Sequence, residues 1–333
     1  MGFKIFGGIK SGCQKQEDFI VDTTGYSFYM DIVSDLKHGK RLAIARAISI
    51  IENNEKEARS LIKKIFKSSG KSIIIGITGP AGAGKSSLID KTALDLKKLG
   101  YKAAVLAIDP TSHITGGAIL GDRVRMSEST DSGTYIRSMA SRGATGAISR
   151  AVRNSIRVLE YAGFDTIIIE SVGAGQTEVE ISKIADITVV VFNPNTGDSI
   201  QTIKAGLTEI GDIYLVNKSD LTGANQLFDA VRDFIGMSEK NPPVMMTSTK
   251  SNKGITEFTK KLNELISIKK KTKNTEEKSR LETELRDIVL NNVKTKVDRM
   301  LDTSNTYEKY LKKVQSKTLD PFEAAEKISK SIK

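Results

Sequence analysis

From residue 72 onward, short apolar runs alternate with longer stretches in which apolar residues recur every three or four positions. The short runs are rich in β-branched residues and apolar on both faces, as parallel strands are when helices cover both sides of a sheet. This alternation predicts an α/β fold with a mostly parallel sheet. The six runs are Ser72–Thr78, Lys102–Asp109, Asp165–Ser171, Ile187–Phe192, Asp212–Lys218 and Pro243–Ser248.

Helical patterns lie on both sides of this region. Residues 1–25 show no period, whereas residues 26–70 carry apolar residues at helical spacing and predict an N-terminal helical extension. Past Asn252 the pattern is helical again. The segment Asp320–Glu323 is typical of a helix start, because an N-cap Asp is followed by Pro at the first helical position.

The C-terminal helices are expected to form a unit of their own. We expect a lysine-rich linker near Ile268–Arg280 to separate the last two helices from the sheet domain. The predicted organisation is therefore a sheet domain over residues 71–268 and a C-terminal helical arm over residues 269–333. A detached arm often serves oligomerisation, which here predicts a homodimer, and packing on its own domain is the alternative.

Composition narrows the class of protein only slightly. The chain has 333 residues, 39% of them hydrophobic and 27% charged, which allows a sizeable core. No apolar run approaches the roughly 20 residues that a membrane-spanning helix needs, and the N-terminus lacks the apolar stretch of a signal peptide. The single cysteine, Cys13, rules out an internal disulfide framework. We therefore expect a cytoplasmic protein that does not bind membranes.

The net charge of +11 raises the question of an acidic partner. A lysine-rich solvated surface explains the charge most simply, although an acidic protein or an anionic ligand would be served equally well. The chain has no tryptophan and no interleaving of aromatic and basic residues of the kind that stacks bases. We therefore expect no nucleic-acid partner.

A motif with specific chemistry follows the first predicted strand. Residues 79–86 match G-x-x-x-x-G-K-[ST] between a strand and an amphipathic helix, the context that a phosphate-binding loop requires. The glycines let backbone N–H groups converge on the β-phosphate, and the helix N-terminus adds positive potential. Lys85 is expected to reach the β- and γ-phosphates and the Ser86 hydroxyl to bind Mg²⁺. The candidate residues are Gly79, Pro80, Ala81, Gly82, Ala83, Gly84, Lys85, Ser86 and Ser87.

A second motif predicts which base is bound. Residues 217–220 read N-K-S-D after a predicted strand and match the N-K-x-D pattern of GTPases. The Asp220 carboxylate can accept from guanine N1–H and the exocyclic amine, a donor pair that adenine lacks, so GTP is favoured over ATP. One βα unit later, residues 248–250 lie where GTPases carry a loop whose backbone N–H contacts guanine O6. The candidate base-binding residues are Asn217, Lys218, Asp220, Ser248, Thr249 and Lys250.

Three acidic residues are candidates for managing Mg²⁺ and its waters. Asp109 and Glu170 end predicted strands, and the carboxyl ends of parallel strands face the crevice that holds a ligand. Asp122 lies in the segment Pro110–Arg142, which is long, polar and rich in Gly, Ser and Arg, as functional loops are. Mg²⁺ prefers few protein ligands, so not all three carboxylates need to bind it directly.

The residues after Glu170 predict how the nucleotide state is sensed. Gly173 is expected to offer its N–H to the γ-phosphate. In Ras-like GTPases the water-positioning glutamine directly follows this glycine, but here Ala174 follows it and the glutamine is Gln176. We therefore predict slow intrinsic hydrolysis that a partner or a conformational change accelerates. Four arginines are either charge-stabilising residues or ordinary solvated and ion-paired ones: Arg123, Arg125, Arg137 and Arg142.

Taken together, these motifs resemble the MeaB/ArgK family of P-loop GTPases. The resemblance runs from about His38 to the DPFEAAEKI segment near the C-terminus. It is carried by AIDPTSHITGGAILGDRVRM (107–126), YIRSMASRGATG (135–146), ESVGAGQTEVE (170–180), TGDSIQTIKAG (196–206) and NKSD (217–220). Thr249 departs from the family, because it replaces the usual alanine of the base-binding loop.

The resemblance implies a function and a set of roles. Such proteins are chaperones of adenosylcobalamin-dependent methylmalonyl-CoA mutase, in which GTP hydrolysis gates cofactor loading and protects the mutase. It also implies a C-terminal dimerisation arm and a further switch at residues 196–206 that responds to the mutase. By position, Lys85, Asp122 and Glu170 would be catalytic, and Ser86, Asp109, Asp122 and Glu170 would manage Mg²⁺.

Two other functions stay open at this point. An older label for the same family is a kinase or ATPase of lysine/arginine/ornithine transport, although the sequence offers no evident base for a second substrate. A metal-insertion GTPase is the other alternative. With one cysteine and two histidines, His38 and His113, a soft-metal site is hard to build within one chain.

Overall fold

The computed structural model describes residues 26–109, 126, 133–140, 145–171, 176–194, 209–236 and 241–331. The expectations for residues 1–25, for most of Pro110–Arg142 and for the switch at 196–206 therefore lie outside the described residues. Among the described helices, none combines the length and the apolar character needed to cross a membrane.

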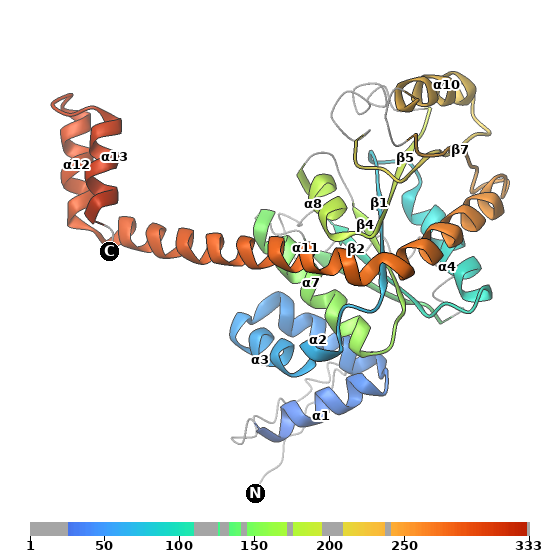
Figure 1. The fold of residues 1–333 in the computed structure, drawn as a ribbon, viewed down its shortest axis with the longest axis horizontal. Helices are drawn as coiled ribbons and strands as arrows, with labels where there is room; N and C mark the ends of the chain where they lie inside the picture. Colours follow the sequence, from blue (N-terminus) through green and yellow to red (C-terminus); the bar gives the residue numbers. More distant parts are fainter. Residues whose placement is uncertain are drawn as a thin grey trace, which may run out of the picture.

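A seven-stranded parallel sheet forms the centre of the molecule, in the order β3-β2-β4-β1-β5-β6-β7 (Figure 1). All six predicted strands are confirmed. β1 and β4, the strands that precede the phosphate loop and end near Glu170, lie side by side at its centre. The strands are β1 (Ile73–Thr78), β2 (Ala103–Asp109), β3 (Tyr135–Ala140), β4 (Thr166–Ser171), β5 (Ile187–Phe192), β6 (Ile213–Val216) and β7 (Val244–Met246).

The sequence analysis missed strand β3, which lies inside the long polar segment. It is an edge strand that pairs with β2 alone among the described strands. Tyr135 and Met139 are buried, whereas Arg137 is only half-buried and forms an ion pair with Glu52 at 2.8 Å. Arg137 and Ser138 interrupt the apolar pattern of this strand, so it lacks the continuous apolar run by which the other strands were predicted.

Helices cover both faces of the sheet, as the apolar strands require. One face packs against α7 (Thr145–Tyr161), α8 (Gln176–Ile184) and the three helices of the N-terminal extension. The opposite face packs against α4 (Lys85–Lys98) and the beginning of α11. The extension consists of α1 (Tyr26–Lys37), α2 (Arg41–Asn53) and α3 (Glu55–Ile65), followed by the short 3₁₀ helix η1 (Phe66–Ser68), and α10 (Ala224–Ile235) packs against β5 and β6.

The expected linker near Ile268–Arg280 is wrong. α11 runs without interruption from Ile255 to Thr303 and crosses the whole lysine-rich segment. This stretch contains neither Gly nor Pro, and lysine is a good helix former, so its charge does not break the helix. Lys273 and Arg280 also bind Asp186, which fastens the segment to the sheet domain.

The end of the chain follows the predicted helix start. Asp320 Oδ1 accepts from the N–H groups of Phe322 and Glu323 at 2.8 and 3.0 Å, and α13 (Pro321–Ser331) begins there. Together with α12 (Asn305–Gln315) it forms a hairpin at the far end of α11, away from the sheet (Figure 1).

Candidate nucleotide site

The phosphate loop leaves β1 after Thr78 and enters α4 at Lys85, in the predicted strand–loop–helix order. Gly82 and Gly84 have φ angles of 77° and 83°, which residues with a side chain rarely adopt. Gly79 is needed for a second reason. A Cβ there would lie 2.1 Å from the carbonyl oxygen of Val191 on β5. Pro80 O accepts from Ala83 N at 3.2 Å, which leaves Ala81 and Gly82 exposed at the tip of the turn.

Two side chains in the first turn of α4 face this loop and the centre of the sheet. Lys85 is buried, and its ammonium group donates to the carbonyl oxygens of Gly79 and Pro80 at 2.7 and 3.0 Å. Ser86 Oγ donates to Glu170 Oε1 at 2.7 Å. Ser87, the remaining residue predicted here, is exposed to solvent. A cation, a hydroxyl and the carboxylate of Glu170 therefore lie close together beside the loop.

Glu170 lies at the carboxyl end of β4, where its neighbours in the sheet are Ile77 of β1 and Ala107 of β2. It is 1% exposed. The next residue, Ser171, donates a hydrogen bond from its hydroxyl to Thr78 Oγ1 at 2.8 Å and so joins the ends of β4 and β1. Hydroxyl and carboxylate oxygens suit Mg²⁺, so Ser86 and Glu170 fit the predicted metal.

Asp109 is the last residue of β2, and its backbone pairs with Ala140 of β3. Asp109 and Glu170 thus both lie at the carboxyl ends of their strands, on the same side of the sheet, as predicted. Asp122 and Gly173 lie outside the described residues. Among the described residues, no group of three or more His, Cys, Asp or Glu side chains is arranged to hold a metal ion.

The base motif lies beside the phosphate loop. Asn217 is fully buried, and its side-chain amide donates to Ala83 O at 2.9 Å. Thr247 Oγ1 donates to Asn217 Oδ1 at 3.2 Å. A Cβ on Gly84 would lie 2.5 Å from Asn217 Nδ2, so the glycine is also required by this contact. The sequence analysis placed Asn217 among the base-binding residues but did not find its bond to the phosphate loop.

Asp220 is exposed at the turn that follows β6, and its Oδ1 accepts from Ser248 Oγ at 2.6 Å. This hydrogen bond lowers the pKa of the Asp220 carboxyl below its ordinary value, with smaller contributions from its own backbone N–H, Lys250 and Lys218. The group is therefore ionised at neutral pH and presents a carboxylate to solvent, next to the turn that carries Thr249 and Lys250.

The turns around Asp220 are held by backbone bonds. Ser219 N donates to Thr247 O at 2.9 Å, and Ser248 N donates to Lys253 O at 2.9 Å. Lys218 adopts a φ of 57°, a left-handed conformation that is uncommon outside glycine, and its Cε comes within 3.8 Å of the Cβ position of Gly84. The Lys218 stem therefore lies along the phosphate loop.

Of the four candidate arginines, only Arg137 lies among the described residues. Its guanidinium donates to Glu52 Oε2 and to Ser49 Oγ, both on α2. The alternative of an ion-paired arginine is thus the one that the structure supports for Arg137.

The fold and the two motifs together describe a P-loop nucleotide-binding protein, and comparison with known proteins gives its family. The sequence profile described as methylmalonyl Co-A mutase-associated GTPase MeaB matches residues 44–302. The chain belongs to the MeaB family. This confirms the predicted family, and with it the assignment of the protein as a P-loop GTPase.

Related proteins agree with the MeaB assignment. A putative GTPase of Pyrococcus abyssi is 42% identical over 312 residues, which cover 91% of this chain and 96% of the relative. The GTPase ArgK of Escherichia coli is 32% identical over 67% of this chain and 71% of its own length. A crystal structure titled LAO/AO transport system kinase matches 92% of this chain and 98% of that chain, with a TM-score of 0.67 and 24% identity, which supports the fold.

Proposed function

We propose that this MeaB-family GTPase binds Mg²⁺-GTP between residues 79–86 and Asp220, and that hydrolysis serves an adenosylcobalamin-dependent methylmalonyl-CoA mutase by gating cofactor loading and protecting the enzyme. The observation that carries the nucleotide site is the bond from Asn217 to Ala83, because it joins the base motif to the phosphate loop across 134 residues of sequence. One bound nucleotide would thus contact both motifs.

The phosphates would be held by Lys85 and by backbone N–H groups. A buried ammonium group needs compensation, which the loop carbonyls now provide. Phosphate oxygens are stronger acceptors, so a bound triphosphate would take over the donors of Lys85. The left-handed glycines and the N-terminus of α4 would supply further donors without side chains in the way.

Ser86 and Glu170 would hold Mg²⁺ together with the predicted Asp109 and Asp122. The ion, when bound, neutralises charge that develops on the β- and γ-phosphates. The present bond between Ser86 and Glu170 holds both oxygens at one point and so prepares the site.

We predict that Glu170→Gln lowers kcat for GTP hydrolysis by about 100-fold and raises the Mg²⁺ concentration needed for half-maximal rate, because a charged ligand becomes neutral. Steady-state phosphate release over a magnesium titration measures both. Glu264→Gln is the matched control, since this carboxylate forms an exposed ion pair with Lys261 on α11. An unchanged magnesium requirement in Glu170→Gln would remove Glu170 from the metal site.

The role with the mutase is supported by the description of the family and by the motifs between residues 107 and 220. We expect the mutase to accelerate GTP turnover, because Ala174 occupies the position of the Ras-like catalytic glutamine. Turnover is to be measured with and without the purified mutase, alongside complex formation with nucleotide-loaded protein. Unchanged turnover with no complex counts against the role, and transfer of labelled γ-phosphate to a protein would favour the transport-kinase alternative.

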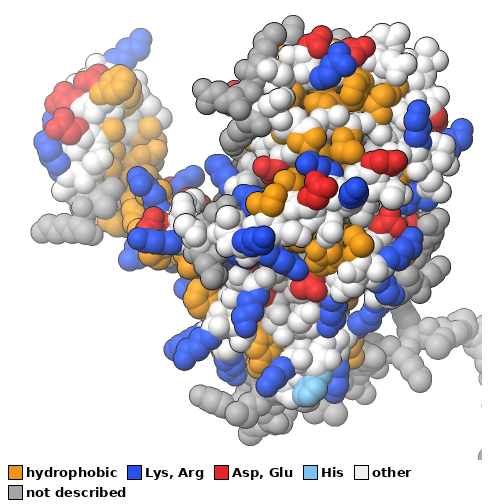
Figure 2. All heavy atoms as spheres, turned by 45° about the vertical axis from the view of Figure 1, so that its right-hand side comes forward, with side chains coloured by type: hydrophobic (Ala, Val, Ile, Leu, Met, Phe, Trp, Pro, Cys, Tyr) orange, Lys and Arg blue, Asp and Glu red, His pale blue; other side chains and the backbone are white. Residues whose placement is uncertain are grey.

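The C-terminal arm would supply the homodimer interface. Several apolar side chains of α11 are exposed at helical spacing, and Figure 2 shows hydrophobic side chains open to solvent on the α12–α13 end of the chain. Contiguous apolar surface of this kind is typical of a protein interface. The exposed residues are Leu281, Leu285, Ile288, Val289, Leu290, Val293, Met300, Tyr307, Leu311 and Phe322.

A further inference from the structure

Asp186 lies at the opposite end of β1 from the phosphate loop, between the end of α8 and the start of β5. Its side chain is 1% exposed. The carboxylate accepts from Ile74 N at 2.7 Å, and Asp186 N donates to Ile74 O at 2.7 Å. These two bonds fasten the end of α8 to the strand that carries the phosphate loop.

The charge of Asp186 is compensated by two residues of α11. Lys273 Nζ lies 3.3 Å from Asp186 Oδ2, and the Arg280 guanidinium binds Oδ1. Lys273 also donates to Ser72 O, just before β1, and Arg280 donates to Ala185 O at 3.4 Å, at the end of α8. A seven-residue spacing places Lys273 and Arg280 on one face of the helix. The arm therefore contacts both elements that Asp186 joins.

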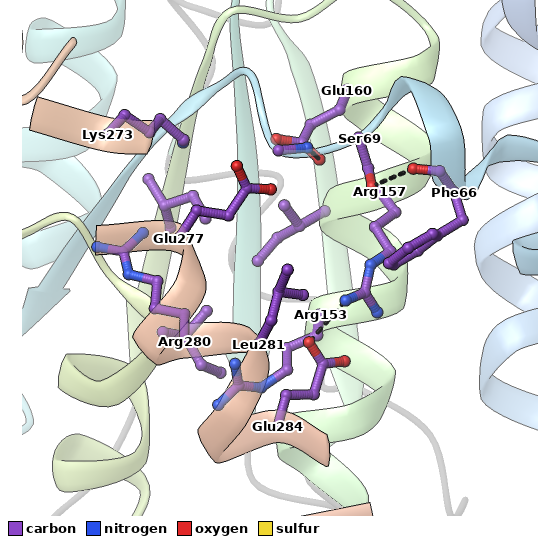
Figure 3. Close-up of a pocket in the computed structure, with 14 residues that line it drawn as sticks. Phe66, Ser69, Arg153, Arg157, Glu160, Lys273, Glu277, Arg280, Leu281 and Glu284 are labelled. Atoms are coloured by element: carbon purple, nitrogen blue, oxygen red, sulfur yellow. Dashed lines mark hydrogen bonds and ion pairs between the residues drawn. The ribbon is translucent and has the colours of Figure 1, made fainter. Parts of the chain in front are cut away.

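Further along the same face, α11 contributes an acidic residue and the sheet domain contributes the basic one. Glu284 pairs with Arg157 of α7 at 2.6 Å, and both side chains are largely buried. Burial lowers the pKa of the neighbouring Arg153, against the opposing effect of Glu284 and Asp287. In Figure 3, Lys273, Glu277, Arg280 and Glu284 of α11 line one side of the pocket, and Glu284 lies beside Arg153 and Arg157 of α7.

The junction between α11 and α7 contains a pocket. The charged side chains line a partly open pocket of about 90 Å³, whose lining also includes Phe66, Ile74 and Leu281 (Figure 3). Between Lys273 and Glu284, α11 is therefore held by directional ion pairs, which add to the apolar packing of its first residues.

α8 also packs directly against β1. A Cβ on Gly76 would lie 2.8 Å from Ile181 Cγ2 and 3.1 Å from Ala185 Cβ, so the missing side chain allows the helix to approach the strand. Gly76 is three residues before Gly79, the first residue of the phosphate loop. At its other end, α8 begins at Gln176, shortly after Glu170. A shift of α8 would therefore displace both β1, which leads into the phosphate loop, and the segment that follows Glu170.

We propose that Asp186 is a positioning residue for GTP hydrolysis. Asp186 holds α8 on β1, and Lys273 and Arg280 of the C-terminal arm stabilise Asp186 in this position. The arm would thereby set the rate of the reaction as well as supply surface for partners. This inference rests on the proposed placement of GTP at residues 79–86, and it requires neither the mutase nor a second copy of the chain.

The test compares Arg280→Gln with Arg280→Lys in the full-length protein. We expect Arg280→Gln to lower kcat roughly 5- to 10-fold while KM for GTP stays within about twofold, because no group that binds the nucleotide is changed. Arg280→Lys keeps the charge on Asp186 and is expected to retain most of the rate. Lys261→Gln is the control, since it removes an exposed ion pair with Glu264 on the same helix.

Hydrogen exchange separates positioning from general loss of stability. In Arg280→Gln, amides of α8 should exchange faster while those of α4 keep their protection. The proposal is overturned if kcat does not change, if KM rises as much as kcat falls, or if Arg280→Lys loses as much rate as Arg280→Gln. Asp186→Asn gives a second route to the same readouts. Failure of the unmodified protein to bind GTP would instead refute the nucleotide site itself.

Discussion

Asn217 is the residue that connects the two halves of the nucleotide site. Its side-chain amide donates to Ala83 O and accepts from Thr247 Oγ1, so Asn217 links the phosphate loop to the end of β7. Asp220, three residues later, is by contrast exposed, and the pKa of its carboxyl is lowered by the Ser248 hydroxyl. Within this four-residue motif, the Asn217 side chain thus binds other parts of the protein, whereas the Asp220 carboxylate is accessible to a ligand.

We predict that Asp220→Asn weakens GTP binding by at least about 100-fold and improves binding of xanthosine triphosphate, because an acceptor is exchanged for a donor. Calorimetry with both nucleotides in the presence of magnesium measures the change. Asp229→Asn serves as the control, since Asp229 is an exposed carboxylate on α10 that pairs with Arg232. Unchanged GTP affinity in Asp220→Asn would refute the base-site assignment.

Helix α8 is held close to β1 at two points. It approaches β1 closely at Gly76, and its end is tied to the same strand through Asp186. Among the residues of β1, Ile73, Ile75 and Ile77 pack on the opposite face, against α4 and α11. The small residue at position 76 therefore reflects the short distance between the helix and the strand.

We predict that Gly76→Ala destabilises the protein by about 1–3 kcal/mol, because the added methyl group overlaps Ile181. Combined with Ile181→Ala, the loss should be smaller than the sum of the two single losses, since the second change removes the group that the methyl meets. Denaturant unfolding of the two single variants and the double variant measures the coupling. Strictly additive losses would show that the contact between Gly76 and Ile181 is not the cause.

At the scale of the whole molecule, the two ends of α11 have different surroundings. Its first residues, among them Phe258, Leu262 and Ile266, are buried against the sheet domain. Its last third leaves the domain and carries exposed apolar side chains toward α12 and α13 (Figure 1). One continuous helix therefore joins the GTPase core to the surface that we assign to the homodimer.

We predict that Val289→Glu with Val293→Glu converts a dimer to a monomer while GTP affinity is kept, because charges on the exposed apolar face oppose its burial. Light scattering coupled to gel filtration gives the mass. Leu42→Glu is the control, since Leu42 is 63% exposed on α2, away from the arm. A wild-type protein that is monomeric at all concentrations would refute the dimer.

The fold and the site differ in how far they follow from the sequence. The phosphate loop and six of the seven strands were predicted because each is encoded in a few neighbouring residues. Strand β3 was missed because Arg137 and Ser138 interrupt its apolar pattern. The linker at 268–280 was wrong because lysine-rich composition does not distinguish a solvated helix from a coil. The dimer and the partners of the site stay predictions.

By itself, the sequence determined the parallel α/β fold, the phosphate loop and the family, because periodicity and motifs act over distances of a few residues. Only the tertiary structure decided the roles of Asn217, Arg137 and Asp186. Each of them meets partners about 85 to 135 positions away along the chain. Such contacts depend on how strands and helices pack in space, which no local pattern specifies.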